Sequence, residues 1–152
     1  MRVLFVCAGN TCRSPMAEAL CRHLAAARGM GGRVQAASVG VSAHNGDPVN
    51  PQALAVLAGH GIAHHGVARR ITPADFAASD LILALDRRVV AALEAMRPAG
   101  NETPVKLLMD YAPQAGVAEV FDPYGTDRYE EAFALIRQGV EGLLAALERE
   151  GE

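Results

Sequence analysis

Cysteine is scarce in this chain of 152 residues, and its three cysteines, Cys7, Cys12 and Cys21, all lie near the start. An odd, clustered set does not make the disulfide framework of a secreted domain. No Cys-x-x-Cys pair occurs, and His23 is the only histidine nearby, so the spacing of a structural zinc site or of a thioredoxin-like redox site is missing. We therefore expect reduced thiols and a cytoplasmic protein.

Long hydrophobic runs and a large charge imbalance are also absent. The apolar run Val3–Cys7 is too short for a signal peptide or a membrane span. Fourteen Lys and Arg against seventeen Asp and Glu give a net charge of −3, which does not favour electrostatic binding of nucleic acid or anionic lipid. Neither Gly-x-Gly-x-x-Gly nor the nucleotide-binding P-loop occurs. We expect neither nucleic acid nor a membrane as a partner.

The hydrophobic pattern predicts one α/β domain over residues 1–152. Hydrophobic residues make up 51% of the chain, enough for a core at this length. Short apolar runs alternate with helical patterns, which predicts a parallel sheet with helices on both faces. The expected strands are residues 3–6, 34–39, 81–85 and 105–109. The expected helices start at Ser14-Pro15 (cap and first position), Asn50-Pro51, Thr72 and Arg87, and the last runs from Tyr129 to Leu147. Residues 98–103 and 112–116 are expected loops.

The segment Cys7-Ala8-Gly9-Asn10-Thr11-Cys12-Arg13-Ser14-Pro15 lies between the first strand and the first helix. Ligands of open α/β sheets bind at the carboxyl ends of strands. A loop that leads into a helix N-terminus also directs backbone N–H groups at an anion. Arg13 can bind two phosphate oxygens through its planar guanidinium. Arg13 and the helix end both favour the thiolate of Cys7, to which Ser14 can donate a hydrogen bond. The segment therefore predicts a nucleophile held against its own phosphate site.

This Cys-x5-Arg-Ser-Pro segment, with Gly9-Asn10 inside it and Cys12 before the arginine, resembles the low-molecular-weight protein tyrosine phosphatase family. The resemblance covers nearly the whole chain, through residues 68–72 before Asp75-Phe76, Asp86, residues 110–113 and Asp122-Pro123-Tyr124. It implies the flavodoxin-like architecture of that family, with four parallel strands. It also implies a hydrolase that dephosphorylates phosphotyrosine in proteins through a phosphocysteine, without a metal or organic cofactor.

The resemblance further implies roles for single residues. Cys7 would attack phosphorus, Arg13 would hold phosphate oxygens, and Asp122 would protonate the leaving oxygen and then activate water. The residues alone do not favour Asp122 over Asp110 or Asp127; the family motif does. Besides these three catalytic residues, the expected substrate-binding residues are Ala8, Gly9, Asn10, Thr11, Cys12, Ser14, His44 and Tyr124.

Two positions resemble the related bacterial protein-arginine phosphatases instead. Thr11 stands where the tyrosine phosphatases usually have isoleucine, and Tyr124 is followed by Gly125 rather than by a second aromatic residue. A threonine hydroxyl could bind a guanidinium N–H or orient a water. Arginine dephosphorylation is therefore the alternative function. A non-catalytic phosphate-binding module is a third hypothesis, disfavoured because Cys7 and Asp122 are both present.

Supporting residues have competing interpretations. The family often has a histidine that supports the loop asparagine, but its place here is Gly66, with His65 one position away. Ser38 is better placed to hold Asn10. Cys12 either packs or forms a reversible disulfide with Cys7, and Cys21 is expected in the core.

Charged faces are less informative. We expect Arg69-Arg70 and Arg87-Arg88 to be solvated faces rather than docking sites. The sequence does not predict the oligomeric state.

Overall fold

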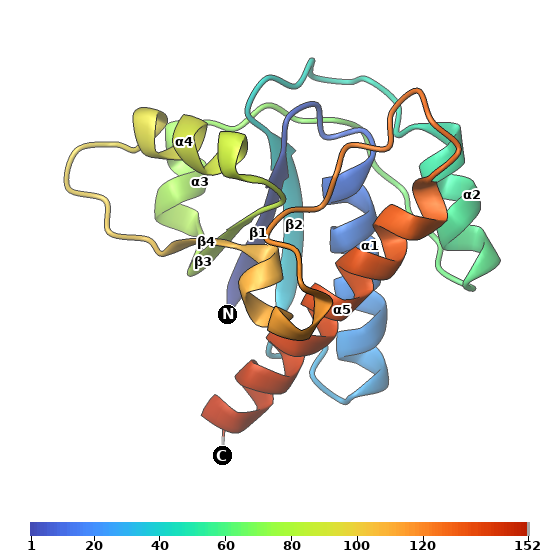
Figure 1. Ribbon diagram of the computed structural model, residues 1–152. Helices are drawn as coiled ribbons and strands as arrows, with labels where there is room; N and C mark the ends of the chain where they lie inside the picture. Colours follow the sequence, from blue (N-terminus) through green and yellow to red (C-terminus); the bar gives the residue numbers. More distant parts are fainter. Residues whose placement is uncertain (152) are drawn as a thin grey trace.

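Figure 1 shows the computed structural model, which describes residues 1–151. Its strands form one parallel sheet in the order β2-β1-β3-β4, which confirms the predicted fold class. The strands are β1 (Arg2–Cys7), β2 (Gln35–Gly40), β3 (Leu81–Ala84) and β4 (Val105–Leu107). The chain leaves β1 for β2 on one side and later returns to β3 on the other. The carboxyl end of β1 is therefore the topological switch point, where doubly wound folds bind ligands.

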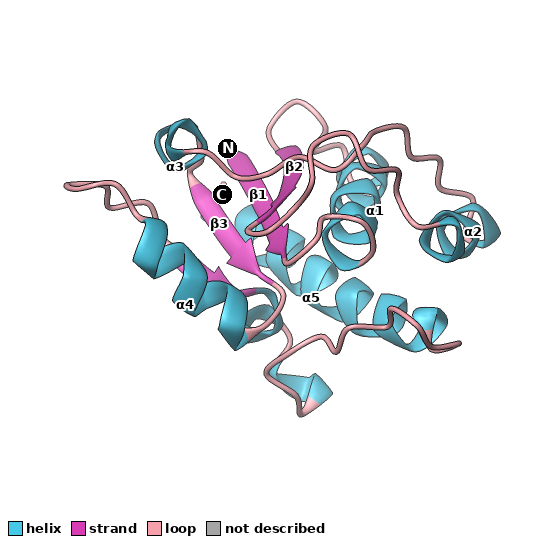
Figure 2. Ribbon diagram, turned by 90° about the horizontal axis from the view of Figure 1, so that it is seen from above, coloured by secondary structure: helices cyan, strands magenta, loops and turns pink. Residues whose placement is uncertain are grey.

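Helices cover both faces of this sheet, as Figures 1 and 2 show. The helices α1 (Arg13–Ala27), α2 (Pro51–Gly59) and α5 (Tyr129–Glu150) lie on one side, and α3 (Pro73–Ala78) and α4 (Arg87–Met96) on the other. Several helices begin at the residues where the sequence pattern predicted a helix start. Asn50 caps α2 by accepting from the Gln52 N–H at 2.8 Å, and Asp86 caps α4 by accepting from the Val89 N–H at 2.9 Å.

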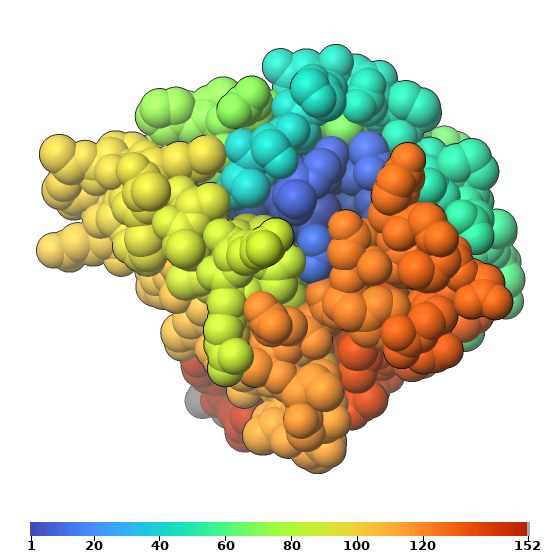
Figure 3. Space-filling view, turned by 45° about the horizontal axis from the view of Figure 1, so that its top comes forward, coloured from blue at the N-terminus to red at the C-terminus, as the bar shows by residue number. Residues whose placement is uncertain are grey.

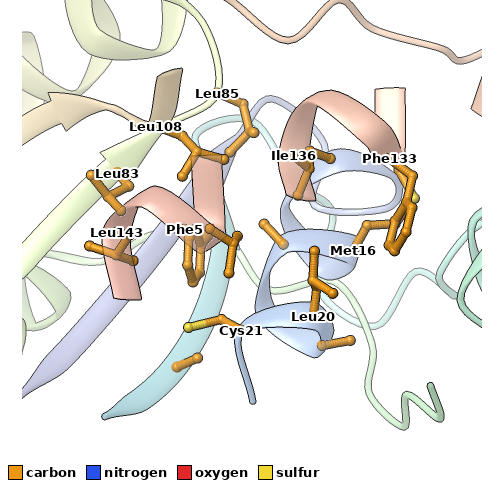
Figure 4. Close-up of a cluster of buried hydrophobic side chains, with 14 of the residues drawn as sticks. Phe5, Met16, Leu20, Cys21, Leu83, Leu85, Leu108, Phe133, Ile136 and Leu143 are labelled. Atoms are coloured by element: carbon orange, nitrogen blue, oxygen red, sulfur yellow. The ribbon is translucent and has the colours of Figure 1, made fainter. Parts of the chain in front are cut away.

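The sheet separates two hydrophobic cores because alternate residues of β1 point to opposite faces. Leu4 and Val6 pack under α3 and α4, whereas Phe5 packs against α1 and α5. Figure 4 shows the larger core around Phe5, where Met16 and Leu20 of α1 meet Phe133 and Ile136 of α5. Burying each such side chain stabilises the fold by roughly 1.5–3 kcal/mol. The two ends of the loop after β1 are thus fixed by packed elements.

Several predicted boundaries were wrong. The fourth strand ends at Leu107, because residues 108–111 turn into a 3-10 helix (η1, Leu108–Tyr111) in which the Asp110 carboxylate accepts from the Leu107 N–H at 3.3 Å. The expected loop at 112–116 contains a second one, η2 (Pro113–Ala115). The second strand lies one residue later than predicted, and the third ends one residue earlier.

The start of α1 also differs from the prediction. The helix begins at Arg13 rather than after Ser14, and Cys12 is its cap residue. The Ser14 hydroxyl does not cap the helix, because it bonds to Cys7 Sγ at 2.9 Å instead. Within residues 1–151, no helix is long and apolar enough to cross a membrane.

Candidate active site

The loop of residues 7–13 joins β1 to α1 at the switch point of the sheet. Backbone hydrogen bonds tie it to the connection that follows β2: Val41 N–H donates to Cys7 O at 3.0 Å, and Ser42 N–H donates to Ala8 O at 3.0 Å. Gly40 allows this close approach, since a Cβ there would lie 2.5 Å from Ala8 O. The loop is therefore fixed from outside as well as at its two ends.

Asn10 has a left-handed backbone, with φ of 56°, and is the only non-glycine residue within 1–151 that has a positive φ. Its side chain is buried and stabilises this conformation. The amide nitrogen donates to Ser14 Oγ at 2.8 Å and to Ser38 Oγ at 3.0 Å, while Oδ1 accepts from the Arg69 N–H at 2.9 Å. Ser38 thus holds Asn10, as the sequence indicated.

These bonds direct a hydrogen bond at the sulfur of Cys7. Ser14 Oγ accepts from Asn10, so its own hydrogen is free to point at Cys7 Sγ, 2.9 Å away, or at Val39 O, 3.4 Å away. The shorter distance favours the sulfur. The Asn10 N–H donates to the same sulfur at 3.3 Å. Two donors directed at Cys7 Sγ stabilise a thiolate there.

Sequence reasoning missed two residues behind this network. Ser38 donates to Glu18 at 2.7 Å, and the largely buried Glu18 carboxylate also binds Arg22 at 2.6 Å. His64 lies nearby: its Nε2 is 3.4 Å from where a Cβ on Gly66 would be. His64, and not His65, therefore fills the space beside Gly66. The sequence held a sign of this: Gly66 takes the place of the histidine that the family often has, and an additional histidine, His64, lies two positions before it.

His64 is partly buried, and its Nδ1 is the one buried side-chain nitrogen or oxygen in the described chain without a hydrogen-bond partner. Burial lowers the pKa of His64, although the charge of Glu18 opposes that shift. A neutral imidazole leaves Arg22 as the cation that balances Glu18.

Arg13 is held from behind, so that part of its guanidinium stays free. Nη1 donates to Asp86 Oδ2 at 2.7 Å and to Val120 O at 2.8 Å. The remaining guanidinium nitrogens make no further hydrogen bond with residues 1–151, and the side chain lines the cleft above Cys7. The free N–H groups are therefore available to two phosphate oxygens.

The opposite wall of the cleft comes from the segment before α5. Asp122 is exposed, and its Oδ1 accepts from the Tyr124 N–H at 3.0 Å. Tyr124 is 70% exposed, as a rim residue free to contact a large substrate would be. The Val120 N–H donates to Leu85 O at 2.9 Å, which anchors the start of this segment to the end of β3. The segment thus brings a carboxylate to the cleft that holds Cys7.

Figure 3 shows the mouth of this cleft, with the residues around 7–13 in dark blue at the centre and the segment around 122–128 in orange beside them. The cleft measures about 180 Å³ and is lined by Cys7, Ala8, Gly9, Thr11, Cys12, Arg13, Asp122 and Tyr124. Asn10 and Ser14 do not line it, because they are buried behind the loop. His44 is exposed and lies outside this lining, so the structure does not bring it into the cleft.

The two other cysteines differ from Cys7 in their surroundings. Cys12 Sγ lies 3.3 Å from the Tyr129 hydroxyl, and burial raises the pKa of both groups. Burial also raises the pKa of Cys21 to about 12. All three cysteines are free thiols, and Cys21 belongs to the larger core, as predicted. Cys12 and Cys21 are thus held as neutral thiols at neutral pH.

No three His, Cys, Asp or Glu side chains among residues 1–151 gather as a metal site would require.

Comparison with known proteins places the whole arrangement in a family. The family model described as low molecular weight phosphotyrosine protein phosphatase matches residues 2–152. The low molecular weight protein-tyrosine-phosphatase YfkJ of Bacillus subtilis is 41% identical over 150 residues, which cover 97% of this chain and 96% of that protein. Its crystal structure superposes with a TM-score of 0.94 at 40% identity, covering 100% of this chain and 97% of that one.

A second solved structure is that of a YwlE arginine phosphatase in which serine replaces a cysteine and the active-site serine is phosphorylated. It has a TM-score of 0.88 and 30% identity, and covers 97% of this chain and 96% of that one. Tyrosine and arginine phosphatases are thus both among the relatives of this fold. The match of the family model from residue 2 to residue 152 shows that the chain belongs to the low-molecular-weight phosphotyrosine protein phosphatase family.

Proposed function

We propose that this protein hydrolyses phosphotyrosine in phosphorylated proteins through a phosphocysteine intermediate on Cys7. The observation that carries the proposal is the position of Cys7 Sγ, which meets the Ser14 hydroxyl at 2.9 Å and the Asn10 N–H at 3.3 Å. Arg13 and Asp122 line the cleft on either side of it. A stabilised nucleophile, an anion-binding guanidinium and a carboxylate in one cleft are what phosphoryl transfer to sulfur requires.

In the first step the Cys7 thiolate attacks phosphorus, the S–P bond forms, and the bond from phosphorus to the tyrosine oxygen breaks. Asp122, in its protonated form, gives its proton to that oxygen, so tyrosine leaves as a neutral phenol. The free N–H groups of Arg13 and the backbone N–H groups of the loop hold the three equatorial oxygens. These groups are already fixed before substrate binds, which lowers the reorganisation cost in the transition state.

In the second step the Asp122 carboxylate takes a proton from a water that attacks phosphorus. The P–O bond forms, the P–S bond breaks, and inorganic phosphate is released. The electron pair returns to Cys7, where the Ser14 hydroxyl stabilises the thiolate as it leaves. Asp122 ends the cycle protonated, as it began. The scheme uses water as its only co-substrate and no metal or organic cofactor.

The relatives support this scheme. YfkJ, at 41% identity, is named a protein-tyrosine-phosphatase. The serine variant of YwlE holds a phosphoryl group on its active-site side chain, which supports covalent catalysis at the corresponding position, Cys7. We further propose the cytoplasm as the compartment, since Cys7, Cys12 and Cys21 are all free thiols.

Arginine dephosphorylation is the second candidate function. Thr11 lines the cleft, so its hydroxyl is available to a guanidinium N–H or to a water. The 30% identity to YwlE, which is named an arginine phosphatase, favours the same idea. Tyrosine remains the first candidate, because the relatives of higher identity are named tyrosine phosphatases.

The test is the turnover of phosphotyrosine and phosphoarginine peptides of the same sequence, measured side by side. We expect the wild type to release phosphate faster from phosphotyrosine, and Cys7→Ser to be inactive on both. Faster turnover of phosphoarginine would move the function to arginine dephosphorylation and would predict that Thr11→Ile reverses the preference. Equal activity of wild type and Cys7→Ser would refute the thiolate mechanism.

A further inference from the structure

Three exposed arginines near the active site have no carboxylate partner. Seven other arginines form ion pairs with carboxylates, among them Arg13 with Asp86. Arg70, Arg87 and Arg88 are exposed, and within residues 1–151 none of their guanidinium groups forms an ion pair or a hydrogen bond; the Glu119 carboxylate accepts from the backbone N–H of Arg87 at 2.8 Å. Their guanidinium groups are therefore available to a partner.

All three lie next to residues that hold the active-site loop, although none of their side chains lines the cleft itself. Arg87 and Arg88 directly follow Asp86, the residue that anchors Arg13. The backbone of Arg70 pairs with Gly40, and Gly40 lies against the Cys7–Arg13 loop. In Figure 3 the start of α4, in yellow-green, borders the cleft on the side away from the orange segment around 122–128.

Arg87 and Arg88 are the first two residues of α4, where the positive end of the helix dipole disfavours cations. Two carboxylates stabilise this helix end: Asp86 accepts from the Val89 N–H at 2.9 Å, and Glu119 accepts from the Arg87 N–H at 2.8 Å. Both carboxylates bind backbone N–H groups here, so the guanidinium groups of Arg87 and Arg88 keep no ion-pair partner.

The charge on the other side of the cleft is of opposite sign. That segment carries Asp122 and the exposed Asp127, and its one arginine, Arg128, is paired with Glu131 at 2.7 Å. The side beside α4 therefore carries three arginines against one carboxylate, Glu119, whereas acidic side chains predominate beside α5. A bound peptide meets a different charge on each side of its phosphorylated residue.

We propose that Arg70, Arg87 and Arg88 form a docking surface for acidic side chains that lie on one side of the phosphorylated residue in the protein substrate. The inference rests on the proposed function, whose substrate class it narrows. It replaces the expectation that Arg87-Arg88 is only a solvated face. Arginine suits this task because its planar fork binds carboxylates with two hydrogen bonds.

Four phosphotyrosine peptides test the proposal. One has three glutamates before the phosphotyrosine, one has them after it, one has glutamines at all these positions, and one has lysines. The wild type should hydrolyse one of the two glutamate peptides with kcat/KM roughly three- to tenfold above the glutamine peptide, which is the range of two or three exposed ion pairs. The lysine peptide should be slowest, and the advantage should shrink as salt rises.

The first variant is Arg87→Gln/Arg88→Gln, and a second variant adds Arg70→Gln to these two changes. The matched control is Arg2→Gln/Arg149→Gln, which removes two exposed arginines near the chain ends, at the opposite end of the sheet (Figure 1). We expect the rim variants to lose the preference for the glutamate peptide and to keep wild-type turnover of p-nitrophenyl phosphate. The control should keep both.

Three results would overturn the proposal: equal rates of the wild type on glutamate and glutamine peptides, equal rates on the two glutamate peptides, or the same loss in the control as in the rim variants. The second and third would indicate long-range steering by net charge instead of docking. Wild-type turnover of p-nitrophenyl phosphate with no turnover of any phosphotyrosine peptide would overturn the proposed function, independently of these comparisons.

Discussion

Arg13 Nη1 lies 2.7 Å from Asp86 Oδ2, and this ion pair links the first turn of α1 to the end of β3. Both side chains are largely shielded from water, with 5% and 19% of their surface exposed. The same Nη1 also donates to Val120 O at 2.8 Å. One nitrogen of the guanidinium, Nη1, is thus held by two acceptors, which orients the other two nitrogens. The ion pair with Asp86 therefore fixes the Arg13 side chain in the cleft.

Removing the negative charge of Asp86 should therefore reduce catalysis. Asp86→Asn keeps the shape but weakens the anchor, and loss of a partner by a buried hydrogen-bonding group costs about 1–3 kcal/mol. We expect kcat/KM on p-nitrophenyl phosphate to fall roughly ten- to hundredfold. Glu94→Gln, which removes the exposed carboxylate that pairs with Arg97, is the control and should leave activity unchanged. An unaltered kcat/KM in Asp86→Asn would contradict the anchoring role.

Asp122 should be the acid and base of the reaction. Asp122→Asn should lower kcat by about 10²–10⁴-fold on aryl phosphates with poor leaving groups, which need the proton most. The loss should be smaller with good leaving groups. Asp127→Asn and Asp110→Asn are matched controls, because the sequence alone did not distinguish these three residues. A leaving-group dependence that appears in Asp127→Asn instead would assign the role to Asp127.

The three thiols should differ in reactivity. At pH 7 iodoacetamide should alkylate Cys7 and leave Cys12 and Cys21 unmodified, because burial raises the pKa of both and they remain neutral thiols. Inorganic phosphate should protect Cys7 by filling the cleft. Mass spectrometry of tryptic peptides gives the modified position. Alkylation of Cys12 at a rate equal to that of Cys7 would mean that the contact with Tyr129 does not shield it.

Gly40 should tolerate no side chain. A Cβ would lie 2.5 Å from Ala8 O and 2.9 Å from Asn10 N, so Gly40→Ala must displace the Cys7–Arg13 loop. We expect an unfolding free energy lower by about 1–3 kcal/mol, the usual cost of overpacking, and a marked loss of kcat. Gly32→Ala is the control, since nothing lies within 4 Å of its added Cβ. Urea unfolding and p-nitrophenyl phosphate turnover measure the two effects, and equal stability of both variants would refute the steric argument.

Most of the fold could be predicted because its signals are local. The apolar runs of β1 and β3 and the three-to-four spacing from Tyr129 to Leu147 each specify an element from its own residues. Boundaries were wrong where a contact with another element decided them. Ser14 looks like a helix cap in sequence, but its hydroxyl bonds to Cys7 and the helix begins earlier.

The candidate site could be predicted only in part. The Cys7–Arg13 loop is one continuous segment, so the sequence alone shows which chemical groups lie together in it. His44 was expected at the substrate, but its side chain is not among the residues that line the cleft, which the sequence around it does not indicate. Glu18 and His64 escaped notice, since their contribution depends on packing against Ser38 and Gly66.

The sequence by itself determined the candidate nucleophile, Cys7, and the loop that follows it, because β1, the loop and α1 are adjacent in the chain. Only the tertiary structure decided what faces that loop. Asp86 and Val120 reach Arg13 from 73 and 107 positions away in the chain. It also placed Arg70, Arg87 and Arg88 next to residues that hold this loop, Gly40 and Asp86. Such pairings depend on how the crossover helices pack on the sheet, and that packing is a property of the whole core.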